Sequence, residues 1–206
     1  MIHIVDYNAG NVTSVQRALA YLGLKSIITA DTAAIQSAER IIFPGVGHAA
    51  AAMRTLKERG LDVALRNAFA QGTPLMGICL GSQIVLTHSE EGDTPCIDLI
   101  DGRAKKFVMD DKSLKIPHMG WNSLLIRQPH PVLQSYSAGR EVYFVHSYYP
   151  QPASEMAVYA ACSYGGLFPA AIGYKNLFAT QFHPEKSGPE GLAMLQNFAA
   201  WDGTLC

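Results

Sequence analysis

The stretch Pro74-Leu75-Met76-Gly77-Ile78-Cys79-Leu80-Gly81-Ser82-Gln83 decides the fold of this chain. Its apolar first half predicts a buried strand, and the pattern Gly-x-Cys-x-Gly predicts a sharp turn from that strand into a helix. Glycines are needed two residues either side of Cys79, because Cβ atoms there would collide in so tight a turn. The turn would lift the Cys79 sulfur out of the sheet and aim the Leu80 amide at a developing oxyanion. The alternative is a small cysteine buried in a strand, and this pattern alone does not separate the two.

Strands and helices alternate before this turn. The predicted strands are residues 2–6, 25–29 and 40–43, the last stopped by Pro44, and the predicted helices are residues 12–22, 48–59 and 61–70. Strands that alternate with helices imply crossover connections and therefore a parallel sheet. We expect an α/β fold with three layers, in which helices flank a mostly parallel sheet.

The second half of the chain has a different pattern. Between about residues 101 and 171 it contains strands and turns with little helical periodicity. The predicted strands there are residues 115–116, 123–127, 141–146 and 156–162, followed by a strand at 177–182 and a helix at 191–200. We therefore expect an antiparallel β-rich segment in the second half of a single domain that spans residues 1–206.

Composition narrows the class of protein. Hydrophobic residues make up 49% of the 206 residues and charged residues 16%, which excludes a disordered chain. The formal net charge is −1, so the basic excess that is typical of a nucleic-acid binder is missing. No apolar run approaches the roughly 18 residues of a membrane span, and no basic targeting segment is visible. We expect a cytoplasmic protein that binds neither membranes nor nucleic acid.

The four cysteines, Cys79, Cys96, Cys162 and Cys206, are widely and irregularly spaced. Because no Cys-x-x-Cys pair occurs, the sequence predicts neither a zinc ribbon nor a thioredoxin-like redox motif. A chain of this length does not need disulfides to fold. We expect reduced thiols, no metal and no cofactor.

A base for Cys79 is present in Phe182-His183-Pro184-Glu185, between a predicted strand and a predicted helix. His183 can accept the thiol proton, and Glu185 can hold the imidazole in the required tautomer. Pro184 restricts the backbone between them. The alternative is a strand-end histidine beside a surface glutamate. The joint occurrence of this motif and Gly-x-Cys-x-Gly at the ends of consecutive strands favours the catalytic interpretation.

A third element is the loop Phe43-Pro44-Gly45-Val46-Gly47, at the end of the strand before the cysteine strand. Its glycines let the backbone turn amides toward a ligand, so Gly45, Val46 and Gly47 can supply a second oxyanion donor beside Leu80. A plain strand-to-helix turn is the alternative. A phosphate-binding loop is disfavoured, because neither glycine-rich phosphate motif is complete.

Together these motifs resemble those of the class I glutamine amidotransferases, which carry a Cys-His-Glu triad. The resemblance covers essentially the whole chain. Its further marks are Asp6-Tyr7 with Gly10-Asn11, Pro117-His118-Met119-Gly120-Trp121-Asn122, Tyr143-Phe144-Val145-His146-Ser147-Tyr148-Tyr149 and the run from Ala179 to Ser187. The resemblance implies that Cys79 attacks the side-chain amide of glutamine and that ammonia leaves. Water then hydrolyses the glutamyl thioester, with His183 as the base.

The resemblance also implies residues that contact glutamine. By position in the motifs they are Gly47, Gln83, Glu91, Ser147 and Tyr148. The acidic residue that holds the α-amino group is Glu91 by its spacing from Cys79, although Glu90 is its neighbour and either could take the role.

A partner is implied in the same way. Within the family, the resemblance is to the member that passes ammonia to a cyclase subunit with a (β/α)8 barrel in histidine biosynthesis, as a heterodimer. The docking face that it implies consists of Asn11, Pro117, Met119, Trp121, Tyr143 and Lys186. For Trp121 and Tyr143 a place in the core is the alternative, and Lys186 could simply be solvated.

Other functions remain open at this point. A glutaminase that serves another synthase is one, and the Pro117–Asn122 run argues against it. A cysteine peptidase or thiol esterase is another, but it would not need an α-amino clamp such as Glu91. A thiol sensor built on Cys79 is a third, and it would not need Glu185.

Overall fold

The computed structural model describes residues 1–8, 10–109 and 114–204. Within that part of the chain the main sheet has eight strands in the order β2-β1-β3-β4-β14-β13-β12-β9. Their bounds in that order are Ser26–Thr29, Ile2–Val5, Arg40–Gly45, Leu75–Cys79, Leu177–Thr180, Leu167–Tyr174, Val158–Ser163 and Leu125–Ile126. The first five strands pair in parallel and the last three pair antiparallel. The predicted mostly parallel sheet with an antiparallel second half is confirmed.

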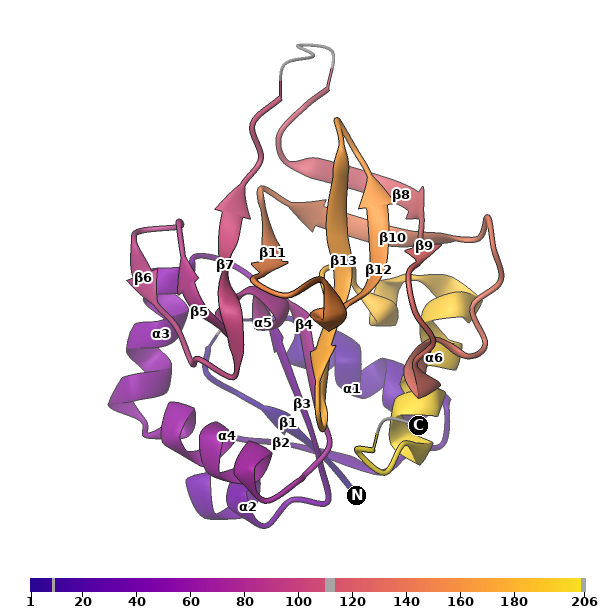
Figure 1. The fold of residues 1–206 in the computed structure, drawn as a ribbon. Helices are drawn as coiled ribbons and strands as arrows, with labels where there is room; N and C mark the ends of the chain where they lie inside the picture. Colours follow the sequence, from indigo (N-terminus) through magenta and orange to yellow (C-terminus); the bar gives the residue numbers. More distant parts are fainter. Residues whose placement is uncertain (9, 110–113, 205–206) are drawn as a thin grey trace.

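Helices cover both faces of this sheet. Their bounds are Val12–Tyr21 for α1, Thr32–Gln36 for α2, Ala49–Glu58 for α3, Leu61–Ala70 for α4, Leu80–Ile84 for α5 and Gly188–Ala200 for α6. Successive side chains of a strand point to opposite faces. Ile41 and Phe43 therefore join the core under α2, α3 and α4, whereas Ile42 joins the core under α1 and α6. Figure 1 shows α2, α3 and α4 on one side of the sheet and α6 on the other.

Two smaller sheets stand beyond the parallel strands. One pairs β10 (Glu141–His146) with β8 (His118–Ser123) antiparallel, so that Tyr143 lies opposite Trp121 and Val145 opposite Met119. The other has the order β11-β7-β5-β6, with bounds Tyr148–Pro152, Ile100–Lys106, Leu86–Ser89 and Thr94–Pro95. Figure 1 shows β8, β10 and β11 above the helices α1 to α4. Three short 3-10 helices, η1 (Pro131–Leu133), η2 (Glu155–Ala157) and η3 (Pro184–Lys186), complete the described elements.

Several predicted boundaries are wrong. Pro44 does not stop its strand, since β3 continues to Gly45 and pairs there with β4. Past Ile42 the strand has no partner in β1, so the missing N–H of a proline is tolerated. Residues 115–116 do not form a strand, because the chain bends at Ile116 and β8 begins only after Pro117.

Other differences concern elements that the sequence pattern did not resolve. The predicted strand at 123–127 is divided at Leu124, between β8 and β9, and the one at 156–162 begins at Val158 after η2. Helix α2 and strands β5, β6, β7, β11 and β13 were not predicted. Helix α2 is only five residues long, too short for periodicity to reveal, although Asp31 caps it by accepting from the Ala33 amide at 2.9 Å.

Within the described ranges, no helix combines the length and the apolar character that crossing a bilayer requires.

Candidate active site

Cys79 lies on a strained turn between β4 and α5. Its backbone has φ 55° and ψ −109°, a conformation that L-residues rarely adopt. A Cβ on Gly81 would collide with the carbonyl oxygen of Phe43, and one on Gly77 would lie 3.0 Å from the Gly81 backbone and 3.1 Å from the Ala179 Cβ. The two glycines are therefore sterically required. The turn buries Cys79 to 6% exposure, with its sulfur at the wall of a cavity.

His183 reaches the same place from the neighbouring strand. Strands β4 and β14 are parallel, with Ile78 opposite Thr180, so the residues that follow each strand emerge at the same edge. The His183 amide donates to the Tyr143 carbonyl at 3.0 Å, and the Ser187 hydroxyl donates to the His183 carbonyl at 2.6 Å. These bonds hold the backbone of His183 against β10.

Glu185 orients the imidazole. The 3-10 helix η3 turns the chain back so that His183 Nδ1 donates to Glu185 Oε1 at 2.7 Å. Both side chains are fully buried. With Nδ1 engaged, Nε2 is the free ring nitrogen, and it has no hydrogen-bond partner among the described residues. The geometry leaves Nε2 available for the proton of a nucleophile.

Asn11 also belongs to this cluster. Its side-chain amide donates to Glu185 Oε1 at 2.5 Å and lies 3.3 Å from His183 Nδ1. Asn11 has φ 65° at the N-cap of α1, which directs its side chain across the sheet edge to η3. The family resemblance implied a docking role for Asn11, whereas its hydrogen bond in the structure is to the Glu185 carboxylate.

The neighbours of His183 determine its charge. Burial by itself would lower the pKa of His183, but the Cys79 thiol and the Glu185 carboxylate outweigh burial and raise the pKa to about 10. The imidazole therefore binds a proton strongly when Cys79 supplies one. This arrangement can generate a nucleophilic sulfur beside a protonated histidine.

A cavity of about 410 Å³ opens at Cys79. It is lined by Val46, Gly47, Cys79, Leu80, Gln83, Glu91, Pro117, Val145, His146, Ser147 and Tyr148. All five residues that were expected to contact glutamine are in this wall. Of the expected oxyanion residues Val46, Gly47 and Leu80 line it, whereas Gly45 is buried beside Cys79 as its sheet neighbour.

The choice between Glu90 and Glu91 depends on tertiary structure. Glu91 lines the cavity, and its Oε2 accepts from the Ala49 amide at the start of α3 at 2.6 Å. Glu90 faces away, with its carboxylate accepting from the Lys106 amide at 2.9 Å. Of the two neighbours, Glu91 is therefore the one that lines the cavity.

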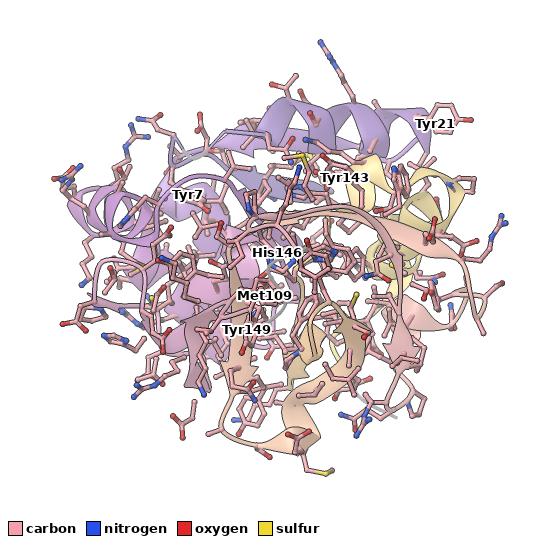
Figure 2. The ribbon with its side chains drawn as sticks, turned by 90° about the horizontal axis from the view of Figure 1, so that it is seen from above. Tyr7, Tyr21, Met109, Tyr143, His146 and Tyr149 are labelled. Atoms are coloured by element: carbon pink, nitrogen blue, oxygen red, sulfur yellow. The ribbon has the colours of Figure 1, made fainter. Side chains whose placement is uncertain are left out.

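The remaining expected docking residues gather beside the triad. Met119 is 63% exposed and Trp121 52% exposed, so Trp121 is not a core residue. The rings of Trp121 and Tyr143 meet edge to face at 5.8 Å, and Lys186 Nζ lies 5.9 Å from the centre of the Tyr143 ring. Pro117 lies on the rim of the cavity. Figure 2 looks down on this face, with Tyr143 and His146 labelled.

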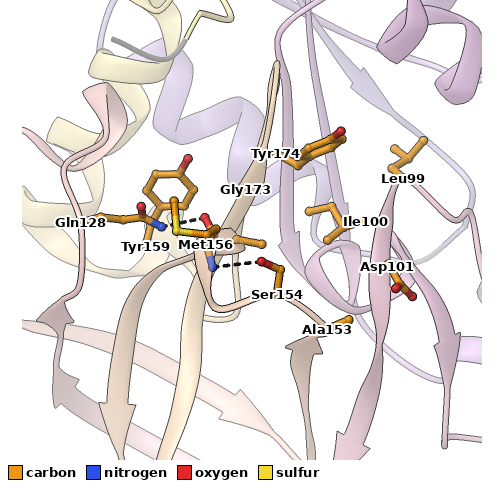
Figure 3. Close-up of a pocket in the computed structure, with 11 residues that line it drawn as sticks. Leu99, Ile100, Asp101, Gln128, Ala153, Ser154, Met156, Tyr159, Gly173 and Tyr174 are labelled. Carbon is orange, nitrogen blue, oxygen red and sulfur yellow. Dashed lines mark hydrogen bonds between the residues drawn. The ribbon is translucent and has the colours of Figure 1, made fainter.

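A larger cavity of about 600 Å³ lies elsewhere, lined by residues that include Ile100, Met156, Tyr159 and Tyr174 (Figure 3). Gln128 in its wall donates to the Met156 carbonyl at 2.9 Å. Its lining holds neither a cysteine nor a histidine, and Asp101 is its one charged side chain. It therefore offers no cysteine–histidine pair of the kind found at Cys79.

Three buried polar side chains at the site were not singled out from the sequence. Gln181 Nε2 lies 3.7 Å from the Cys79 sulfur, and His118 Nδ1 lies 3.1 Å from His146 Nε2. His118, His146 and Gln181 lie inside the family motifs, and that position was the available signal. In the part of the chain that the structure describes, no group of three His, Cys, Asp or Glu side chains could hold a metal ion.

Comparison with protein families identifies related sequences. The model of the glutamine amidotransferase class-I family matches residues 3–201. The chain is 48% identical over 206 residues to imidazole glycerol phosphate synthase subunit HisH of Nitratidesulfovibrio vulgaris (strain DSM 19637 / Miyazaki F), covering 98% of this chain and 97% of that protein. It is 44% identical over 202 residues to the subunit of the same name from Geobacillus kaustophilus (strain HTA426), covering 96% and 95%.

Solved structures share the fold. A crystal structure of a glutamine amidotransferase has a TM-score of 0.74 at 16% identity and covers 97% of this chain and 100% of that chain. The structure of PurLQS from Thermotoga maritima has a TM-score of 0.72 at 20% identity and covers 97% of both chains. Identities this low establish the α/β architecture alone.

Proposed function

The chain belongs to the class I glutamine amidotransferases, and from that membership we infer that it is the glutaminase subunit of an imidazole glycerol phosphate synthase. It hydrolyses glutamine to glutamate and ammonia. The observation that carries the assignment is that Cys79 and Glu91 line one cavity, while His183 interacts with Cys79 from behind that wall. A nucleophile, a base and an α-amino clamp are what a glutaminase needs, and a thiol sensor would need neither of the last two.

The residues of the cavity suggest how glutamine binds. The Glu91 carboxylate receives the α-amino group. Gln83 uses both of its amide N–H groups inside the protein, on the Tyr148 carbonyl at 2.8 Å and on Gln181 Oε1 at 2.9 Å. Its own oxygen thus remains to accept from the substrate. Ser147 and Tyr148, on the opposite wall, complete the enclosure of the ligand.

The reaction proceeds by covalent catalysis. His183 Nε2 takes the proton of Cys79, and the sulfur attacks the side-chain amide carbon of glutamine. The amide of Leu80 and an amide from the loop Gly45–Gly47 stabilise the oxyanion. The C–N bond then breaks, the nitrogen takes the proton from His183, and ammonia leaves. Water, deprotonated by His183, attacks the thioester carbon, and glutamate and the Cys79 thiol are released.

The ammonia is consumed by a partner. We propose that a cyclase subunit with a (β/α)8 barrel docks as a heterodimer on the face with Met119, Trp121, Tyr143 and Lys186. Half-exposed aromatic and methionine side chains are typical of interface anchors, and these border the triad through Tyr143, whose ring centre is 6.4 Å from that of His183. Ammonia would then reach the cyclase through the complex. The free thiols of Cys79, Cys96 and Cys162 suit a cytoplasmic enzyme.

Coupling between the subunits would act on the loop after β3. Gly47 has φ 100°, a backbone conformation that permits its peptide to reorient. In the free subunit the loop amides would not be aligned with the oxyanion, and docking would align them. A free subunit that turns over glutamine as fast as the complex would refute this coupling.

The test is glutamate release from glutamine, for wild type and Cys79→Ala, with and without the cyclase and its ribonucleotide. We expect release that requires Cys79 and rises when both partners are present. Absence of release under every condition would contradict the assignment.

A further inference from the structure

A continuous chain of buried hydrogen bonds starts at the Cys79 sulfur. Gln181 Nε2 lies 3.7 Å from that sulfur, and Gln181 Oε1 accepts from Gln83 Nε2 at 2.9 Å. Gln83 Nε2 also donates to the Tyr148 carbonyl at 2.8 Å. Gln181 is fully buried and Gln83 is 4% exposed, so water does not compete for these groups.

The orientation of both amides follows from a single backbone atom. The Tyr148 carbonyl oxygen can only accept, so the group of Gln83 that faces it must be the NH₂. The same NH₂ faces the side chain of Gln181, which must therefore present its oxygen. The NH₂ of Gln181 is then left to point at the Cys79 sulfur. The tautomer of His146 follows in the same way, since its Nδ1 lies 2.8 Å from the Tyr148 carbonyl and must carry the hydrogen.

A donor directed at sulfur acts differently on the two protonation states of Cys79. The thiol can itself donate to the Val145 carbonyl, 3.9 Å away. Once the proton has moved to His183, the sulfur is a charged acceptor, and hydrogen bonds to charged groups are stronger than neutral ones. Gln181 supplies a side-chain donor to this charge, in addition to the nearby protonated imidazole of His183.

We propose that Gln181 is a catalytic residue whose side-chain amide stabilises the thiolate of Cys79, and that Gln83 is the positioning residue that holds that amide in register. The inference rests on the proposed function, in which Cys79 is the nucleophile. It gives Gln83 a role in the free enzyme, before any substrate is bound.

The experiment measures alkylation of Cys79 by iodoacetamide as a function of pH, in the full-length protein without glutamine. Mass spectrometry of the Cys79 peptide separates this residue from the other cysteines. Burial raises the pKa of both Cys96 and Cys162 to about 12, so they react slowly. This readout is independent of glutamine turnover.

The main variant is Gln181→Met, which keeps the length of the side chain and removes the donor. We expect its alkylation profile to move to higher pH by about one unit, which makes the reaction up to about tenfold slower at pH values below the midpoint of the wild-type profile. At alkaline pH, where Cys79 is ionised in both wild type and Gln181→Met, the alkylation rates of the two proteins should converge. A packing defect would instead slow the reaction by the same factor at every pH.

The matched control is Gln128→Met. Gln128 also donates its amide to two backbone carbonyls, those of Met156 at 2.9 Å and Val158 at 2.8 Å, but it lines the separate 600 Å³ cavity. We expect the Cys79 profile of this variant to match wild type. Thermal unfolding of every variant establishes that it is folded.

Gln83→Met is the second variant, for use if Gln181→Met does not fold. It leaves Gln181 in place and removes its anchor, so the shift should have the same direction and a smaller size. A folded Gln181→Met protein with the wild-type profile, or one slowed equally at all pH values, would overturn the proposal. If only Gln83→Met folds, its unshifted profile would do the same.

Glutamate release by the same preparations, with the cyclase and its ribonucleotide, separates this inference from the proposed function. Wild type that alkylates with a Gln181-dependent profile but releases no glutamate would contradict the glutaminase assignment and support the Gln181 bond. Active wild type with an unshifted Gln181→Met profile would overturn the Gln181 bond alone.

Discussion

Two buried histidine sites lie near the Cys79 cavity, and their pKa values are shifted in opposite directions. His183 is paired with Glu185 at 2.7 Å and lies near Cys79, and these two neighbours raise its pKa to about 10. His118 and His146 are paired with each other at 3.1 Å. Burial lowers the pKa of His118 to about 4 and that of His146 to about 3. The imidazoles of His118 and His183 further disfavour a positive charge on His146.

The difference lies in the neighbours, since both sites are buried. His118 stacks on Phe144 with ring centres 4.8 Å apart and on Tyr164 at 4.0 Å, and aromatic rings of this kind leave a buried cation without an anionic partner. His183 has a carboxylate on one ring nitrogen and a thiol near the other. Burial therefore makes the first pair a neutral structural element and leaves His183 able to take a proton.

Replacing the base should have the largest effect. In His183→Gln, glutamate release by the complex should fall about 10³-fold or more, because no group remains to accept the thiol proton. In His146→Gln, which keeps a donor toward the Tyr148 carbonyl, the loss should stay within about tenfold. Steady-state glutamate release measures both. Equal losses in the two variants would mean that the sites do not differ in function.

Replacing the carboxylate should have a somewhat smaller effect. In Glu185→Gln, turnover should fall about 10²-fold to 10³-fold, because the amide no longer holds Nδ1 protonated or stabilises the charged imidazole. The variant should remain folded at neutral pH but unfold at a lower temperature than wild type, because it loses the stabilisation that the carboxylate gives to the charged imidazole. Unchanged turnover would remove Glu185 from the triad.

Acidification should destabilise the protein through the pair His118 and His146, and not through His183. The unfolded histidines titrate near 6.5, but His118 and His146 in the fold resist protonation down to about 4 and about 3. Between those values the unfolded state binds protons that the native state does not, so stability falls as the pH falls. Urea unfolding should show a shallower acid loss for His118→Gln than for wild type. A parallel pH profile for the two proteins would contradict the lowered pKa values.

Alkaline pH should reveal a smaller effect of opposite sign. The pKa of His183 is raised from 6.5 to about 10, so its contribution to stability is complete below pH 6.5 and is lost as the pH rises through about 10. Wild type should lose more unfolding free energy over this window than Glu185→Gln, in which the pKa of His183 is raised less. Urea titrations at a series of pH values measure this, with His118→Gln, which keeps Glu185, as the control.

The local patterns predicted the parallel half of the molecule well. The elbow at Cys79, the helices α1, α3 and α4 and the turn with His183 and Glu185 all depend on residues within a few positions of one another. Short elements were missed for the converse reason, since α2 and β6 are too short to show a period. The strand expected at 115–116 is absent because the chain bends at Ile116, next to Pro117, whose nitrogen cannot donate to a sheet.

The residues of the candidate site also divide into those that a local pattern identified and those that it did not. Cys79, His183 and Glu185 could be selected from motifs because each chemical role was tied to a local pattern. Asn11 and Gln181 could not be assigned their contacts, because those contacts join residues 174 and 102 positions apart. The choice of Glu91 over Glu90 needed the position of α3, whose first amide turns Glu91 toward the cavity.

By itself, the sequence determined the architecture and the family and singled out a candidate nucleophile and base, because hydrophobic periodicity and steric demands such as those of Gly77 and Gly81 act over short distances. The tertiary structure alone decided which polar side chains meet. Hydrogen bonding and charge depend on distances between elements. No local pattern indicates that Gln181 contacts the Cys79 sulfur or that His118 and His146 form a buried hydrogen bond with each other. The neighbours that set the pKa values of the three histidines were therefore visible only in the fold.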